Sequence, residues 1–268
     1  MPEEQTVDLN PRFVIVPLMR CLHEAMDVTK IALKAVDTAE FAESVEVSGS
    51  KFAWIFHGGV RSNDEKRAAY EDWLLSKGLQ ELARGVRETL EHAYLFCALI
   101  EHFNEMGNRS KWHDVRELLR KKRRDANDLR FPDLMREVSK KTTTPVDFTD
   151  QFLSLQNVRN VLEHRGGRVT PDKADKNTGL LVLSWPKFKL YYEKNGEEVE
   201  VAPGTVVDSG GPEDTVQIMG RLAVEDREFK VGEQIVFKRA EFYDIAWGCW
   251  LFAERLVGRL PVIEAVPS

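Results

Sequence analysis

One long apolar stripe constrains the fold of this chain more than any other feature. Between Glu65 and about Met106, apolar side chains recur every three or four residues, the spacing that places them on one face of a helix. The stripe consists of Leu79, Leu82, Val86, Leu90, Tyr94, Cys97, Ile100 and Phe103. The sequence therefore predicts a long helix over residues 65–106, with a break at Gly78, where a side chain is missing.

The same spacing predicts helices on both sides of this stripe. A first helix is indicated by Val14, Leu18, Leu22, Ala25, Met26, Ile31 and Ala35. Two shorter helices are predicted over residues 112–124 and 133–140. Residues 45–59, which contain Trp54-Ile55-Phe56 and end in Gly58-Gly59, interrupt the helical pattern and favour a strand or a hairpin-like connection.

The pattern changes to strands after Pro171. Residues 180–183 are continuously apolar, apolar and polar residues then alternate to Tyr192, and Asn195-Gly196 is typical of a tight hairpin turn. Residues 215–222 and 233–237 predict two further strands. The apolar face of a last helix, over residues 240–257, needs a surface to cover, so we expect it to return to the other helices.

The expected fold class is therefore mainly α, a helical bundle with a small antiparallel β insertion before the last helix. We expect the bundle to span residues 1–170, with one of its helices at about 145–165. The β-rich insertion is expected at 178–238 and the C-terminal helix at 239–258. The length of 268 residues suits one large domain or two small ones.

Composition excludes several classes of protein. A net charge of -6 argues against non-specific coating of nucleic acid, although a local basic patch remains compatible with RNA or DNA binding. The acidic N-terminus does not resemble a secretory signal, and the longest apolar runs are too short to span a membrane, so we expect a cytoplasmic protein without a membrane partner. Three separate cysteines among apolar residues favour buried free thiols.

Two patterns are reminiscent of metal sites but are incomplete. His23-Glu24 begins like a zinc-protease helix, yet Asp27 stands where the second histidine belongs. Glu88 and His92 are four residues apart, whereas a di-iron helix needs a spacing of three and a second copy. Solvated helix faces explain these residues better, so we expect no metal and no cofactor.

A basic run allows two interpretations. It comprises Arg116, Arg120, Lys121, Lys122, Arg123 and Arg124. Cations near a helix C-terminus complement the helix dipole, which explains the run without a ligand. Clustered Lys and Arg in an acidic protein also form local phosphate-binding faces, so a nucleic-acid role stays open.

The sharpest lead to function is the segment from Gln156 to Gly167. It combines an arginine, an amide and a histidine at the end of a helical pattern, and a fixed cation beside a group that exchanges protons near neutral pH suits phosphate chemistry. Thr144, Pro145 and Asp147 predict the start of this helix, and Gly166-Gly167 predict its end. Its apolar face contains Phe148, Leu155, Val158, Val161 and Leu162.

This segment resembles the R-x4-6-H signature of HEPN domains, helical bundles named for nucleotide binding in higher eukaryotes and prokaryotes. Arg159, Asn160 and His164 fall on its three positions, and Arg165-Gly166-Gly167 also looks like the residues after the histidine in bacterial members. The resemblance is tight over about a dozen residues. It is only architectural over the other helices and does not extend to the β segment.

The resemblance implies a metal-independent endoribonuclease, in a toxin or defence context, whose active site forms across a homodimer. His164 would then act in acid–base transfer, Arg159 would stabilise charge on the phosphoryl group, and Asn160 would orient the histidine or the phosphate. On one helix Arg159 and His164 lie about 140° and roughly 7.5 Å apart, so two helices meeting about a twofold axis are the natural arrangement.

Other interpretations of the segment stay open. Arg159 could simply pair with Glu163, and Asn160 and His164 could bond the carbonyls of the glycine turn. The chain would then be a non-catalytic scaffold that binds RNA, nucleotides or proteins. A protein antitoxin is a further expected partner, but Gly166 replaces the tyrosine that is modified in some HEPN toxins, which argues against that form of control. A small-molecule enzyme sited in the β segment has no motif in its favour.

Overall fold

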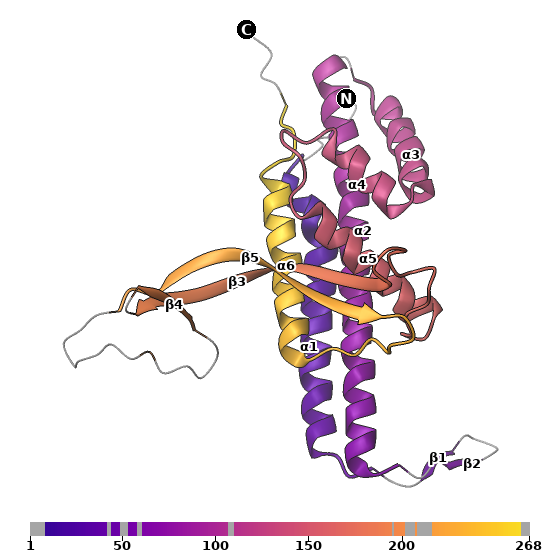
Figure 1. The fold of residues 1–268 in the computed structure, drawn as a ribbon. Helices are drawn as coiled ribbons and strands as arrows, with labels where there is room; N and C mark the ends of the chain where they lie inside the picture. Colours follow the sequence, from indigo (N-terminus) through magenta and orange to yellow (C-terminus); the bar gives the residue numbers. More distant parts are fainter. Residues whose placement is uncertain are drawn as a thin grey trace.

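The computed structural model describes residues 9–41, 44–48, 53–57, 61–106, 110–194, 196–201, 207 and 216–263. Three helices lie side by side along the molecule: α1 (Val16–Thr38), α2 (Asn63–Met106) and α6 (Arg239–Val257) (Figure 1). A 3-10 turn, η1 (Pro11–Ile15), precedes α1. Three shorter helices follow α2, namely α3 (Trp112–Asp128), α4 (Phe131–Ser139) and α5 (Thr149–His164). The mainly α prediction is confirmed. Among the described helices, none has the length and apolar composition that a membrane span requires.

The longest helix, α2, is continuous through Gly78, so the predicted break is wrong. A Cβ atom on Gly78 would stand 2.7 Å from Cε2 of Phe242 and 3.1 Å from Oγ1 of Thr29. The missing side chain therefore lets α6 and α1 approach α2 closely, a use of glycine that leaves the helical backbone intact. The predicted stripe is buried from Leu79 to Ile100.

The strands form two antiparallel sheets. Strands β1 (Ser44–Ser48) and β2 (Ala53–His57) pair as the predicted hairpin-like connection, while Gly58-Gly59 lie outside the described residues. The second sheet has the order β4-β3-β5, with β3 at Leu180–Lys194, β4 at Glu197–Glu200 and β5 at Met219–Lys230. Lys194 pairs with Glu197 across the predicted turn, where Gly196 has φ 81°; Asn195 is not among the described residues.

The two other predicted strands need correction. The strand expected at 215–222 is β5, which begins at Met219 and continues to Lys230; Thr215 lies outside the described residues. Residues 233–237 form no strand, only an isolated bridge between Gln234 and Arg168. Two of their three apolar residues, Ile235 and Phe237, are buried in the core, which explains why the segment has the composition of a strand.

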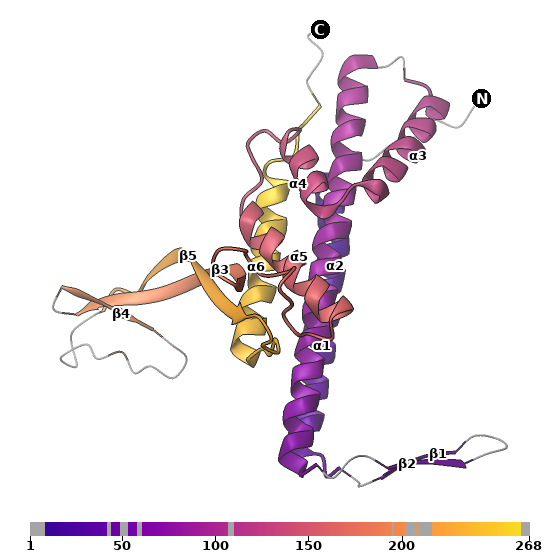
Figure 2. The same ribbon diagram turned by 45° about the vertical axis from the view of Figure 1, so that its right-hand side comes forward.

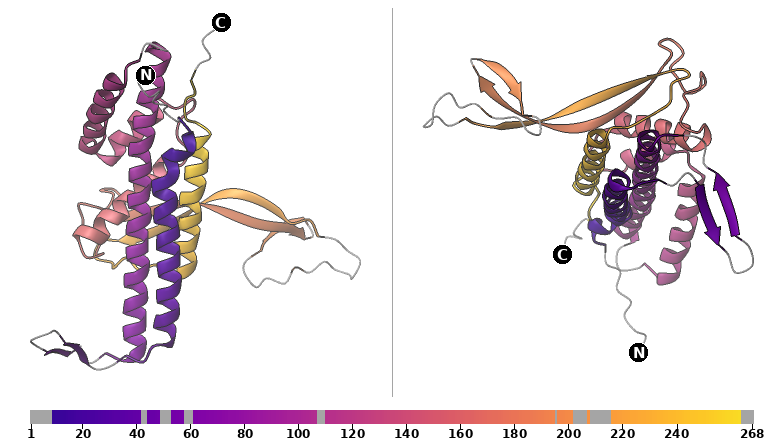
Figure 3. Two further views of the ribbon diagram at one scale, coloured as in Figure 1. Left: turned by 180° about the vertical axis from the view of Figure 1, so that it is seen from behind. Right: turned by 90° about the horizontal axis from the view of Figure 1, so that it is seen from below.

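The β3–β5 ribbon has an inner half that belongs to the core and an outer half that extends beyond the helices (Figures 2 and 3). Leu181, Leu183, Trp185 and Phe229 of the inner half are at most 4 % exposed and join one cluster with residues of all the long helices. The Ser154 hydroxyl of α5 donates to the carbonyl of Ser184 in β3. The N–H of Ser184 in turn donates to the Ser154 hydroxyl. The helices and the base of the ribbon thus share a single core.

The three cysteines are free and buried, as predicted. Burial raises the pKa of the Cys97 thiol to about 12, and it also raises the pKa values of Cys21 and Cys249. A thiol with a raised pKa stays protonated at neutral pH, so these side chains act as small apolar groups in the core.

Candidate functional site

The start of α5 differs from the prediction. The helix begins at Thr149, with Phe148 before it in the left-handed conformation (φ 59°), so Thr144, Pro145 and Asp147 lie outside the helix. Tertiary contacts explain the difference, because residues 143–147 are tied to other elements. The N–H of Val146 donates to Ser139 Oγ (3.1 Å), and the Asp147 carboxylate pairs with Arg259 (2.6 Å).

The end of α5 confirms the predicted stop at Gly166-Gly167. Both glycines have positive φ (59° and 81°), and the N–H of Gly167 donates to the Val161 carbonyl (3.1 Å). The segment before α6 fixes this turn, since the N–H of Ile235 donates to the Gly167 carbonyl (2.8 Å) and Gln234 Nε2 donates to that of Gly166 (3.0 Å). The glycine turn that ends α5 is therefore held both by α5 itself and by Gln234 and Ile235.

Two of the three predicted site residues, Arg159 and His164, lie near one oxygen of Glu163. The Arg159 guanidinium lies 2.7 Å from Glu163 Oε2, and His164 Nε2 lies 3.8 Å from that same oxygen. The His164 side chain is 69 % exposed, whereas the Arg159 side chain is 28 % exposed. The guanidinium therefore extends along the helix to Glu163, and the imidazole lies near the same carboxylate, at a distance too long for a hydrogen bond.

Asn160 belongs to the arginine side of this group. Its Oδ1 accepts from Arg159 (3.3 Å) and from Gln156 Nε2 (3.3 Å), and no bond to His164 is present among the described residues. Asn160 therefore orients the guanidinium and not the imidazole. The predicted Arg159–Glu163 pair is confirmed, whereas neither Asn160 nor His164 bonds a carbonyl of the glycine turn in the described structure.

A cavity of about 490 Å³ opens beside Arg159 and Asn160. It is lined by Arg87, Arg130, Phe131, Pro132, Leu153, Gln156, Asn157, Arg159 and Asn160, which come from α2, the start of α4 and α5. His164 lies outside this lining, one turn further along α5. The cavity presents three guanidinium groups and three amides, a combination that suits the oxygens of a phosphate.

Arg87 and Arg130 were missed in the sequence, because they lie far from the motif along the chain. Arg87 is positioned by Glu91 (2.8 Å) and donates to the carbonyls of Leu129 (3.0 Å) and Asn127 (3.4 Å). Only the fold brings Arg87 and Arg130 to the cavity beside α5. Gln156 carried a detectable signal, since it stands one helical turn before Asn160.

Arg159 keeps one unsatisfied donor. Its Nε is buried and has no hydrogen-bond partner among the described residues. A buried donor without a partner costs about 1–3 kcal/mol, and Arg67 Nε, Thr170 Oγ1 and Trp185 Nε1 are in the same state elsewhere in the described structure. The arginine is therefore held through its terminal nitrogens by Glu163 and Asn160, while its buried Nε has no partner.

One residue of the incomplete metal patterns, Glu88, is engaged in ion pairs. In the described residues no three His, Cys, Asp or Glu side chains are grouped as a metal site would need. Glu88 pairs with Arg84 (2.6 Å) and Arg20 (3.3 Å). This face of α2 therefore carries surface ion pairs.

Comparison with known proteins adds no relative: the chain matches no protein-family model, no curated protein and no solved structure.

Proposed function

We propose that this protein is a metal-independent endoribonuclease with a HEPN-type bundle and the active site at Arg159, Asn160 and His164. The observation that carries the proposal is that the Arg159 guanidinium and the exposed His164 imidazole lie 2.7 Å and 3.8 Å from one Glu163 oxygen. The adjoining cavity with Arg87 and Arg130 supports a phosphate-bearing substrate.

The chemistry follows from the properties of these groups. An imidazole takes the proton of the RNA 2'-hydroxyl, the 2'-oxygen attacks the adjacent phosphorus, and the bond from phosphorus to the 5'-oxygen breaks. A proton passes to that leaving oxygen, so the products are a 2',3'-cyclic phosphate and a 5'-hydroxyl. Arg159 stabilises the negative charge on the phosphoryl oxygens, and Asn160 holds the guanidinium in place.

Glu163 occupies the position that a phosphate oxygen would take against Arg159. A helical pair at this spacing contributes only about 0.2–0.5 kcal/mol, so a phosphate can displace the carboxylate at little cost. The pair thus keeps the guanidinium aimed along the helix while the site is empty of substrate.

A homodimer completes the proposal. One α5 supplies a single imidazole, whereas the reaction needs both a proton acceptor and a proton donor, and two copies about a twofold axis supply two. Multi-angle light scattering tests this directly: a mass of twice the chain mass of 30.7 kDa is expected, and a monomer at micromolar concentration contradicts it.

The enzymatic proposal is tested with His164→Ala in EDTA. Single-stranded RNA is incubated with the wild type and the variant, and the 2',3'-cyclic phosphate ends are measured by mass spectrometry. Loss of the acid–base group should slow cleavage by roughly 10²–10⁴-fold. Because His164 is exposed, the variant should unfold at the wild-type temperature.

His23→Ala is the matched control, since His23 is exposed on α1 and does not line the cavity. It should cleave RNA like the wild type. Equal background cleavage in the wild type and His164→Ala would remove the ribonuclease proposal.

A non-catalytic binding bundle is the second candidate, and one observation favours it. His164 does not line the cavity, and Asn160 is engaged with Arg159 and not with His164. In that case RNA or a nucleotide binds at the arginine-lined cavity without being cut. Binding that survives His164→Ala but is lost in Arg87→Ala, with no cleavage by the wild type, would establish this function instead.

The toxin or defence context makes a separate prediction. Expression of the wild type in bacteria should slow growth more than expression of Arg159→Ala, because the variant lacks the phosphoryl-stabilising cation. Equal growth of both strains at matched protein levels would argue against a toxin and against a protein antitoxin as partner.

A further inference from the structure

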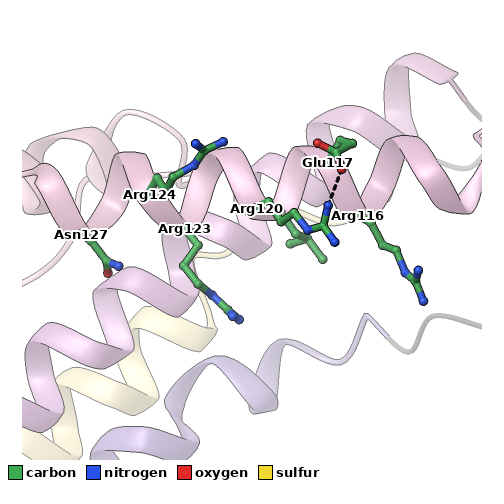
Figure 4. A pocket seen from close by; sticks show the side chains of 7 residues that line it. Arg116, Glu117, Arg120, Arg123, Arg124 and Asn127 are labelled. Atoms are coloured by element: carbon green, nitrogen blue, oxygen red, sulfur yellow. Dashed lines mark hydrogen bonds and ion pairs between the residues drawn. The ribbon is translucent and has the colours of Figure 1, made fainter.

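The basic run of α3 has a definite arrangement in the structure. Arg116, Arg120 and Arg123 project from the same side of the helix, with Arg124 turned to its flank (Figure 4). At 100° per residue, the first three fall within an arc of about 60°. They line a surface cavity of about 700 Å³ together with Glu117, Leu119, Arg124 and Asn127. We call Arg116, Arg120 and Arg123 the arginine stripe.

Most of the positive charge of the arginine stripe is not paired with carboxylates in the described residues. Of its three guanidinium groups, only that of Arg120 has a carboxylate partner in the described part of the chain, Glu117 at 2.7 Å. Like charges one helical turn apart destabilise a helix by about 0.2–0.5 kcal/mol per pair. The helix dipole favours basic residues near the C-terminus but does not require them to share one side, so the stripe is not explained by helix stability.

An aromatic ring extends the stripe toward the start of α3. Trp112 is 41 % exposed, and the guanidinium of Arg116 lies 5.6 Å from the centre of its ring. Trp112 stands four residues before Arg116 and therefore on the same side of the helix. Exposed aromatic rings beside a row of cations are the common features of surfaces that bind single-stranded nucleic acid.

The cavity along the arginine stripe and the cavity beside Arg159 are lined by residues that are close in sequence. Asn127 lines the α3 cavity, and Arg130, three residues later, lines the cavity beside Arg159. Arg87 of the second cavity donates to the carbonyls of Asn127 and Leu129, which fixes the turn between α3 and α4 to α2. The last turn of α3 and the connection to α4 therefore supply a lining residue to each cavity, Asn127 and Arg130.

We propose that the arginine stripe and Trp112 bind the single-stranded RNA substrate and guide its backbone past the α3–α4 turn to Arg87, Arg130 and Arg159. This inference names the substrate-binding surface of the proposed ribonuclease and rests on that function for the identity of its ligand. Phosphates lie along the guanidinium groups, and a base stacks on the indole. The surface has charge complementarity to RNA although the whole chain has a net charge of -6.

The test measures binding separately from cleavage. Fluorescence anisotropy of a labelled oligouridine of about twenty nucleotides is recorded in EDTA with His164→Ala protein, across a salt series. The stripe variant adds Arg116→Gln, Arg120→Gln and Arg123→Gln. The control adds Lys30→Gln, Lys34→Gln and Lys176→Gln, which remove the same charge at exposed positions elsewhere.

The stripe variant should bind at least about tenfold more weakly at low salt, because three phosphate contacts are lost. The slope of log Kd against log salt should fall by about 2, since each contact to single strands contributes about 0.7. Trp112→Ala should weaken binding by roughly five- to a hundredfold with the salt slope unchanged. The lysine control should keep most of the affinity and the original slope.

Three results would overturn the inference: equal affinities of the stripe variant and the lysine control, no binding of RNA by either, or stripe-dependent binding to phosphatidylserine vesicles in place of RNA. Failure of this inference and failure of the proposed ribonuclease function give different results. Binding through the stripe without cleavage by the wild type removes the ribonuclease and keeps the surface, whereas cleavage that is insensitive to the stripe removes only the surface.

Discussion

Replacing Phe229 by alanine tests whether the helices depend on the β ribbon for their stability. Phe229 lies on β5, is fully buried, and packs 6.4 Å from the ring of Phe237. Removing a buried phenylalanine costs about 3–5 kcal/mol, a large share of the roughly 5–15 kcal/mol that stabilises a folded protein. At roughly 2–4 °C per kcal/mol for chains near this size, the melting temperature should fall by about 6–20 °C.

The assay is thermal unfolding followed by far-ultraviolet circular dichroism, which reports mainly the helices. Leu222→Ala is the matched control, because Leu222 lies on the same strand but is 41 % exposed. It should change stability by no more than about 0.5 kcal/mol. A helical transition that stays at the wild-type temperature in Phe229→Ala, or that separates into two steps, would refute the shared core.

Two further predictions concern contacts between the long helices. Gly78→Ala should destabilise the protein by about 1 kcal/mol in urea unfolding, because overpacking against Phe242 outweighs the gain in helix propensity; a more stable variant would contradict this. Arg239 donates to Asp37 (2.7 Å) and to Glu71 (2.6 Å), which joins α6 to α1 and α2. The hydrogen bonds from Arg239 lower the pKa of Asp37, so their stabilisation is complete above the ordinary pKa of aspartate and is lost as the pH falls through the lowered value. Arg239→Met should therefore lower the melting temperature by a few degrees at neutral pH and leave it unchanged in strong acid, and a constant difference across this pH range would contradict the linkage.

The helices could be predicted because their signal is local. The stripe from Leu79 to Ile100 repeats with the period of a helix and is buried as expected. The pairing of β3 with β4 is equally predictable, since the two strands are adjacent in sequence. Where a pattern is decided by neighbours along the chain, the sequence was sufficient.

The structure differs from the sequence prediction where distant residues decide the local conformation. Thr144 and Pro145 have the chemistry of a helix start, but contacts from Ser139 and Arg259 hold this segment outside the helix. Ile235 and Phe237 are apolar because they fill the core, not because they pair in a sheet.

The candidate site was predictable only in part. The Arg159–Glu163 pair is expected from helical spacing and was one of the alternatives that the sequence left open. The approach of Arg87 and Arg130 to α5 depends on how three helices meet, which no spacing within the sequence reveals. The direction of the Asn160 side chain toward Arg159 is likewise a property of the folded chain.

The sealing of the three cysteines has a practical consequence. Since Cys21, Cys97 and Cys249 remain protonated in the interior, maleimide reagents at neutral pH should leave the folded protein unmodified. Cysteines introduced at exposed positions such as Lys121 and Leu222 would then take spin labels selectively. Pulsed electron resonance between them would measure, in solution, the span from α3 to the outer ribbon without any need to replace the native thiols.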